Sequence, residues 1–168
     1  PVTNDYGLSK RLYGRYMMDF SADFTFYHFI LPNMFSEDDL KPGTRLVPYT
    51  LQYLQDYNVG KNTQNPSFSA GLQTRQFITL EEMIQTVDKA VCKHIVSGIY
   101  NMGGGEFLSI RNLIERLFAI YNVPCKDEFF GQEVRRDGDI KSLRIDGSKL
   151  MNELGVLPNS KIEDIFKI

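Results

Sequence analysis

A run of apolar side chains from Phe24 to Leu31 limits what this chain can fold into more than any other segment. A short apolar run of this kind is typical of a strand buried on both faces of a parallel sheet, and Pro32 ends it because proline cannot donate to a strand ladder. Just before it, residues 5–22 carry apolar side chains at helical spacing, at Leu8, Leu12, Tyr16 and Phe20. A helix followed by a buried parallel strand predicts an α/β fold.

The same alternation of helices and strands continues to the end of the chain. Leu46 to Leu54 has helical spacing, and Thr79 with Glu82 forms a capping box that predicts a helix through about Val96, ended by Gly98. Further helices are expected from Ser109 to Ile120 and from Ser148 to Gly155. Short strands are expected near residues 67–70, 75–79, 100–102 and 143–145, and residues 36–44 and 61–66 should be loops.

Composition places the chain among ordinary globular proteins. Its 168 residues suit one domain with its own core, and 42% of them are apolar. A net charge of −2 gives no electrostatic reason to bind nucleic acid or an anionic membrane, and no apolar run approaches the ~18 residues of a membrane span. Cys92 and Cys125 stand apart, as free thiols do in a reducing compartment, so we expect a cytoplasmic protein without a metal site.

Tyr6 and Lys10 are the residues with the clearest chemical meaning. On a helix, positions i and i+4 are neighbours, so the ammonium of Lys10 can stabilise the phenolate of Tyr6. A phenol exchanges protons near neutrality only with such help, and carbonyl reduction and alcohol oxidation both need a group of this kind. The spacing alone is also common on exposed helices, so it acquires meaning only from the rest of the sequence.

The order of the later segments supplies that meaning. Residues 1–10 resemble the catalytic turn of the extended short-chain dehydrogenase/reductase family, which includes nucleotide-sugar epimerases, dehydratases and reductases. Six more segments resemble family motifs in the family's order, namely residues 29–35, 71–77, 79–82, 100–105, 136–139 and 146–155. The resemblance implies a partial Rossmann-like parallel sheet with a small α/β substrate-binding subdomain. Residues 1–35 would end the dinucleotide-binding fold, and residues 36–168 would be mostly substrate-binding, interleaved with late Rossmann elements, within a single incomplete domain spanning residues 1–168.

Departures from the family pattern are also informative. Ile30, Ser36, Gln76 and Asp137 replace the family's usual arginine, glycine, aspartate and proline. No glycine-rich strand-turn-helix motif opens the chain, and the glycines at 103–105 suit a tight turn better than a phosphate cradle. We therefore expect the C-terminal half of an enzyme that uses NAD or NADP when whole, with no dinucleotide bound by this chain alone.

The resemblance assigns the reaction chemistry to the first part of the chain. Tyr6 would be the general acid/base, Lys10 would lower its pKa and hold the nicotinamide ribose, and Pro32 would flank the nicotinamide ring. The resemblance also implies contacts with a nucleoside diphosphate sugar: Asn33 with the sugar or diphosphate, Leu46 and Val47 with the base, Arg75 and Arg136 with the diphosphate, and Asp139 with Arg136 or the ribose.

Other interpretations stay open at this point. The arginines also suit a solvated surface, and Asn33 also suits a strand end. The chain could be one half of a split enzyme, or a non-catalytic module that binds a nucleotide sugar or a protein. In the family, the helix that matches residues 5–22 packs against its copy, so we predict a homodimer through that helix.

Overall fold

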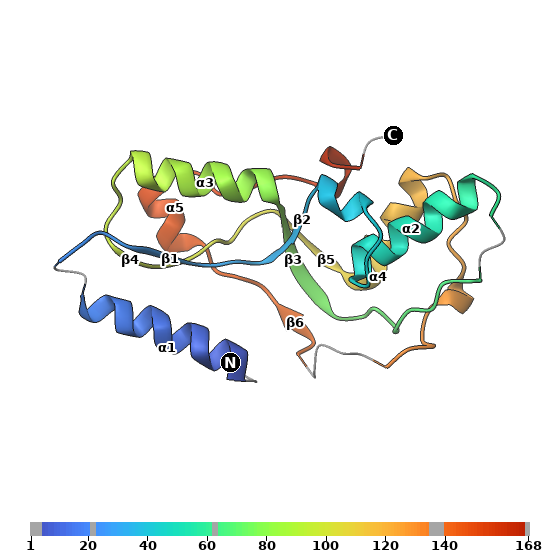
Figure 1. Cartoon of the computed structure of the whole chain (residues 1–168), viewed down its shortest axis with the longest axis horizontal. Helices are drawn as coiled ribbons and strands as arrows, with labels where there is room; N and C mark the ends of the chain where they lie inside the picture. The colour runs from blue at the N-terminus through green and yellow to red at the C-terminus, as the bar shows by residue number, and fades with distance from the viewer. Residues whose placement is uncertain (1–4, 21–22, 62–63, 135–139, 167–168) are drawn as a thin grey trace.

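Two small sheets organise the fold in the computed structural model, which describes residues 5–20, 23–61, 64–134 and 140–166 (Figure 1). In the first sheet, β1 (Tyr27–Ile30) pairs in parallel with β4 (Gly98–Asn101). In the second, β3 (Thr74–Thr79) pairs in parallel with β2 (Asn33–Phe35) and β6 (Ser142–Leu143) and antiparallel with β5 (Glu106–Ser109). The fold is mixed α/β with parallel pairing, which confirms the predicted fold class.

Helices cover both faces of the first sheet (Figure 1). On one face, α3 (Leu80–Cys92) and α5 (Ser148–Leu154) pack against Tyr27, Phe29 and Tyr100. On the other face lies α1 (Asp5–Asp19), where a Cβ on Gly14 would be 3.2 Å from the His28 ring and 3.3 Å from Ile99. Alternate residues of β1 and β4 thus point to opposite helix layers, as the two-residue period of a strand requires.

The apolar run at 24–31 gives a shorter and less buried strand than the sequence predicts. The parallel pairing is confirmed, but β1 comprises only Tyr27–Ile30, and each of its residues is half-buried or exposed. Two features of the described part of the chain explain this: Gly14 is the one buried residue of α1, and no strand pairs with the second edge of β1. Most large apolar side chains of α1 consequently remain exposed.

A second core lies between the second sheet and two helices, α2 (Leu46–Asn58) and α4 (Ile110–Ile120). Leu51 and Leu54 from α2 meet Leu113 and Leu117 from α4, all with no exposed surface. Short 3-10 turns complete the chain at Glu37–Leu40, Asp127–Phe129 and Ile162–Asp164. Within the described residues, none of the helices combines the length and apolar character needed to cross a bilayer.

The helix starts follow the sequence signals closely. The Thr79 hydroxyl accepts a hydrogen bond from the Glu82 backbone N–H at 3.1 Å, and the Ser109 hydroxyl accepts one from the Asn112 N–H at 3.0 Å. The reciprocal half of the capping box is missing, because the Glu82 carboxylate binds the N–H groups of Asn159 and Ser160 instead, each at 2.8 Å.

Helix ends and short strands agree less well with the prediction. The helix that begins at Leu80 stops at Cys92 rather than Val96, because the chain turns at His94, where φ is 49°. Gly98 therefore starts β4 instead of ending the helix. The strand expected near 67–70 is reduced to one bridge, between Phe68 and Phe130. By contrast, α5 ends at Gly155 as expected, with φ of 75°.

Candidate functional site

A cavity of about 810 Å³ opens between the second sheet and the N-terminal ends of α2 and α4. We call it the large cavity. Residues predicted for the cofactor and the substrate line it although they are far apart in the sequence: Pro32, Asn33, Leu46, Val47 and Arg75. Its size falls within the ~300–1,000 Å³ range of small-molecule sites. The fold thus gathers five of the predicted site residues around one opening.

One face of β3 forms a wall of this cavity. Gln73, just before the strand, and Arg75 and Phe77 within it are two residues apart, so they point to the same side. Phe77 is in register with Asn33 of β2, which places the asparagine beside the phenylalanine end of this row. Moving along β3 from Asn33, the cavity wall therefore presents an aromatic ring, a guanidinium and an amide in that order.

The N-terminal end of α2 also faces the large cavity. Its cap residue, Arg45, has a β-region backbone and makes no side-chain cap hydrogen bond. Leu46, Val47 and Pro48 of its first turn line the cavity, and Pro48 has no backbone N–H. The positive end of a 13-residue helix with uncapped N–H groups suits an anionic group of a ligand.

Arg75 is a buried arginine whose guanidinium bonds to backbone carbonyls. It is only 7% exposed, and its guanidinium donates to the carbonyls of Thr74 at 2.8 Å and Ile140 at 2.9 Å. These bonds hold the segment at Ile140 against β3. Elsewhere around the cavity, the Arg45 guanidinium donates to the Asp39 carboxylate at 2.7 Å. Arg75 therefore contributes positive charge to the cavity wall and fixes the neighbouring backbone.

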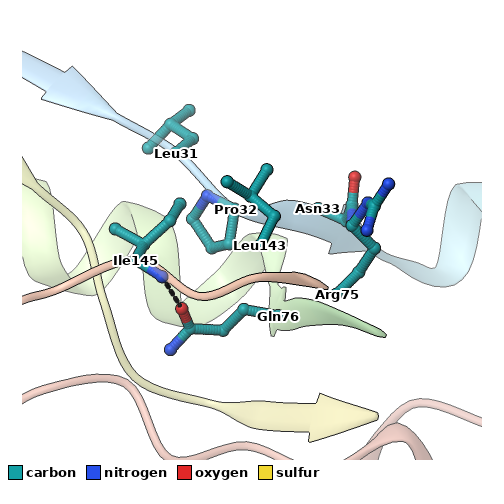
Figure 2. Close-up of a pocket in the computed structure, with 7 residues that line it drawn as sticks. All are labelled: Leu31, Pro32, Asn33, Arg75, Gln76, Leu143 and Ile145. Carbon is teal, nitrogen blue, oxygen red and sulfur yellow. Dashed lines mark hydrogen bonds between the residues drawn. The ribbon is translucent and has the colours of Figure 1, made fainter. Parts of the chain in front are cut away.

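A smaller pocket of about 90 Å³ adjoins the large cavity at the end of β1 (Figure 2). Pro32, Asn33 and Arg75 line both spaces, and Leu143 and Ile145 close the small pocket from the β6 side. Figure 2 shows the Asn33 and Arg75 side chains at one end of this pocket and Leu31 at the other. Pro32 follows the carboxyl end of a parallel strand, where open α/β sheets bind ligands.

Tyr6 and Lys10 occupy neighbouring positions in the first turns of α1. The Lys10 Nζ lies 5.2 Å from the centroid of the Tyr6 ring, as the i, i+4 spacing predicts. Tyr6 is 73% exposed, and neither residue belongs to the lining of the two cavities. In Figure 1 the N-terminal end of α1 lies toward β6. Arg136 and Asp139, predicted for the diphosphate and the ribose, lie outside the described residues.

The glycines at 103–105 are needed for close packing of backbone. A Cβ on Gly105 would lie 2.0 Å from the Phe77 carbonyl oxygen, and one on Gly104 would lie 2.4 Å from the Pro158 oxygen. Both glycines also have positive φ, 67° and 111°. Since backbone of other segments already lies where these side chains would be, residues 103–105 are a close-packed link from β4 to β5, and they open no helix N-terminus for a dinucleotide phosphate.

Several cavity residues escaped the sequence analysis. Gln73, Tyr49 and Phe68 line the large cavity, and the two rings form an edge-to-face pair with centroids 5.8 Å apart. The strand period gave a usable signal for Gln73, because a residue two positions before Arg75 shares its face. No local signal marks Tyr49 or Phe68. Among the described residues, no group of three or more His, Cys, Asp or Glu side chains is placed to hold a metal.

No protein-family model matches this sequence, and no curated protein matches it significantly. Solved structures do match. RMD from Pseudomonas aeruginosa, complexed with NADPH, aligns with a TM-score of 0.81 and 17% identity over 99% of this chain and 54% of its own. The UDP-glucose 4-epimerase of Thermotoga maritima, solved with UDP-glucose, aligns with a TM-score of 0.76 and 19% identity. That alignment covers 96% of this chain and 50% of the epimerase.

A third match is the dTDP-glucose 4,6-dehydratase of Bacillus anthracis, solved in complex with NAD. It aligns with a TM-score of 0.73 and 16% identity over 99% of this chain and 51% of its own. This chain spans about half the length of each of the three proteins. The resemblance to the extended short-chain dehydrogenase/reductase family is therefore confirmed at the level of the fold, and the chain is built like about half of such an enzyme, consistent with its C-terminal half.

Proposed function

We propose that this chain is the substrate-binding portion of an NAD(P)-dependent nucleotide-sugar epimerase, dehydratase or keto-reductase. One observation carries the proposal: Pro32, Asn33, Leu46, Val47 and Arg75, chosen from the sequence, line a single cavity. A surface role for these residues would not require them to converge. The large cavity would hold a nucleoside diphosphate sugar.

The cavity wall suits each part of such a ligand. The diphosphate would lie near the N-terminal end of α2 and the Arg75 guanidinium, because both favour negative charge. The sugar would lie toward Asn33 and Pro32, next to the small pocket. Leu46 and Val47, half-buried, would contact the base through their apolar side chains. Arg136 and Asp139 stay sequence-based predictions for the diphosphate and the ribose.

The reaction would depend on Tyr6 and Lys10. When bound, NAD(P) supplies or accepts the hydride. Tyr6 would exchange a proton with a hydroxyl or keto oxygen of the sugar, and the Lys10 ammonium would stabilise the phenolate. Tyr6, Lys10 and Pro32 would hold the nicotinamide end. The packed turn at 103–105 does not fit a pyrophosphate, so we expect the 168-residue chain alone to bind sugar nucleotides and no dinucleotide.

Calorimetric titration tests this proposal. The chain is titrated with UDP-, dTDP- and CDP-sugars, and with NAD(H) and NADP(H). We expect at least one sugar nucleotide to bind and neither dinucleotide to bind tightly. Arg75→Lys should weaken the sugar nucleotide about tenfold, because lysine keeps the charge but loses the planar fork. The matched control is Arg15→Lys on exposed α1. Tight dinucleotide binding, or equal binding by both variants, would contradict the proposal.

We also propose that α1 forms a homodimer contact. Leu8, Leu12 and Tyr16 on α1, continued by Phe20 just after it, form a stripe with exposed fractions of 45%, 55%, 59% and 38%. Contiguous apolar surface of this kind is characteristic of interfaces between proteins. Because the buried contact of α1 with the sheet is made at Gly14, the stripe stays available for a second copy.

A further inference from the structure

Gln73 is buried at the wall of the large cavity without a complete set of hydrogen bonds. It is 7% exposed, and its Oε1 has no hydrogen-bond partner among the residues that the structure describes. No other buried side-chain nitrogen or oxygen in those residues has this property. Its backbone carbonyl, by contrast, accepts a hydrogen bond from Ile110 at 3.0 Å, so the residue is firmly placed.

Gln76 provides a direct comparison on the same strand. It is 6% exposed, and both ends of its amide are bonded: Nε2 donates to the Gly104 carbonyl at 2.5 Å, and Oε1 accepts from the Ile145 N–H at 2.8 Å. A buried amide with a structural role is satisfied in this way. A buried amide left incomplete is unfavourable, and its position at the cavity lining makes its oxygen available to a group that enters the cavity.

The position of Gln73 identifies the part of the ligand that it meets. Strand residues advance about 3.3 Å each, so Phe77, Arg75 and Gln73 lie in steps of about 7 Å along the cavity wall. Asn33, at the sugar end, is beside Phe77, and Arg75 faces the diphosphate under the proposed function. The next step along the same row reaches the nucleoside. Tyr49 and Phe68 add flat aromatic surface to the same cavity.

We infer that the Gln73 amide is a specificity-determining group that hydrogen-bonds the nucleobase of the substrate. This rests on the proposed function. A terminal amide rotates readily about its last torsion, so its oxygen can turn to a ligand, and it presents a donor and an acceptor side by side. Nucleobase edges carry the same adjacent pair, which allows two parallel hydrogen bonds.

The test compares Gln73→Met and Gln76→Met with the unchanged chain. Methionine matches the length of glutamine but has no amide. Binding is measured by calorimetry with UDP, dTDP, CDP, GDP and ADP, and with inorganic pyrophosphate as a probe that has no base. Stability is measured as the urea midpoint. For whichever nucleotide binds, we expect Gln73→Met to weaken it about tenfold. Gln73→Met should bind pyrophosphate as the unchanged chain does, and its urea midpoint should be unchanged or higher. Gln76→Met should lower the urea midpoint.

The outcomes separate the two proposals. If the unchanged chain binds none of the five nucleotides, the proposed function fails and the inference fails with it. If a nucleotide binds and Gln73→Met binds it equally well, only the inference is overturned. A fall in the urea midpoint of Gln73→Met as large as that of Gln76→Met would also overturn it, because the amide would then be structural.

Discussion

The Oε1 of Gln76 accepts a hydrogen bond from the backbone N–H of Ile145 at 2.8 Å, across 69 positions of sequence (Figure 2). The Nε2 of the same amide donates to Gly104. One side chain therefore joins β3, the glycine turn and the segment after β6. At this position the family that the sequence resembles usually has an aspartate. The observed role of the glutamine is structural.

Gln76→Met should lower the free energy of unfolding by about 2–3 kcal/mol, since two backbone groups lose their partners inside the protein. Urea denaturation followed by circular dichroism measures the change. Gln85→Met is the matched control, because Gln85 lies exposed on α3 and its Nε2 donates to the Glu81 side chain. If both variants unfold at the same urea concentration, the cross-link has no energetic importance.

Gly105→Ala should destabilise the fold severely. The added Cβ would lie 2.0 Å from the Phe77 carbonyl oxygen, so the glycine turn would have to separate from β3. Gly60 has a similar φ of 72° but open space around it, and Gly60→Ala should cost only about 1 kcal/mol. Thermal unfolding of both variants separates the packing effect from the backbone strain that they share. Comparable losses at the two positions would contradict the packing explanation.

Tyr6→Phe should remove most catalytic turnover from an enzyme completed by the N-terminal half of a relative. General acid/base catalysis typically contributes about 10²–10⁴-fold, and phenylalanine keeps the ring but cannot exchange a proton. Turnover is followed by chromatography of the sugar-nucleotide product, because an epimerase or dehydratase regenerates its nicotinamide in every cycle and only a reductase consumes it. Tyr57→Phe is the control, because it also removes an exposed tyrosine hydroxyl, on α2 and 51 positions away from Tyr6 in the sequence. Unchanged turnover in Tyr6→Phe would favour a non-catalytic binding module.

Leu12→Glu should convert the proposed dimer to a monomer. It places a charge within the exposed stripe of α1, and burying that charge against a second copy is unfavourable. Light scattering at about 0.1 mM distinguishes the two states. Leu72→Glu is the control, since Leu72 is 76% exposed and lies outside α1. A monomeric unchanged chain at that concentration would refute the interface.

The two cysteines should differ in alkylation. Burial raises the pKa of the Cys125 thiol to about 11, whereas Cys92 is exposed. Because the thiolate is the reactive form, Cys125 should stay largely protonated and unreactive with iodoacetamide at pH 8.5, and its rate should rise steeply as the pH approaches 11. Mass spectrometry of peptides from native protein assigns each site. Equal labelling at pH 8.5 would show that Cys125 is not shielded in solution.

The sequence by itself determined the elements whose causes are local. Apolar spacing gave the helices, the Thr79 and Ser109 hydroxyls marked two helix starts, and Gly155 marked a helix end, because caps and amphipathic faces depend on residues within one or two turns. The ordered motifs also identified the family fold, and the resemblance pointed to five of the residues that line the large cavity. Each of these signals lies in neighbouring positions of the chain.

Only the tertiary structure decided how those segments meet. It brought Asn33 and Arg75 to one cavity, left the Gln73 amide incomplete beside them, and gave the corresponding amide of Gln76 two distant backbone partners. It also stopped α3 at Cys92 and left β1 half-buried. Such outcomes depend on contacts between residues dozens of positions apart. Hydrogen bonding and burial are properties of the packed chain, so no local pattern in the sequence fixes them.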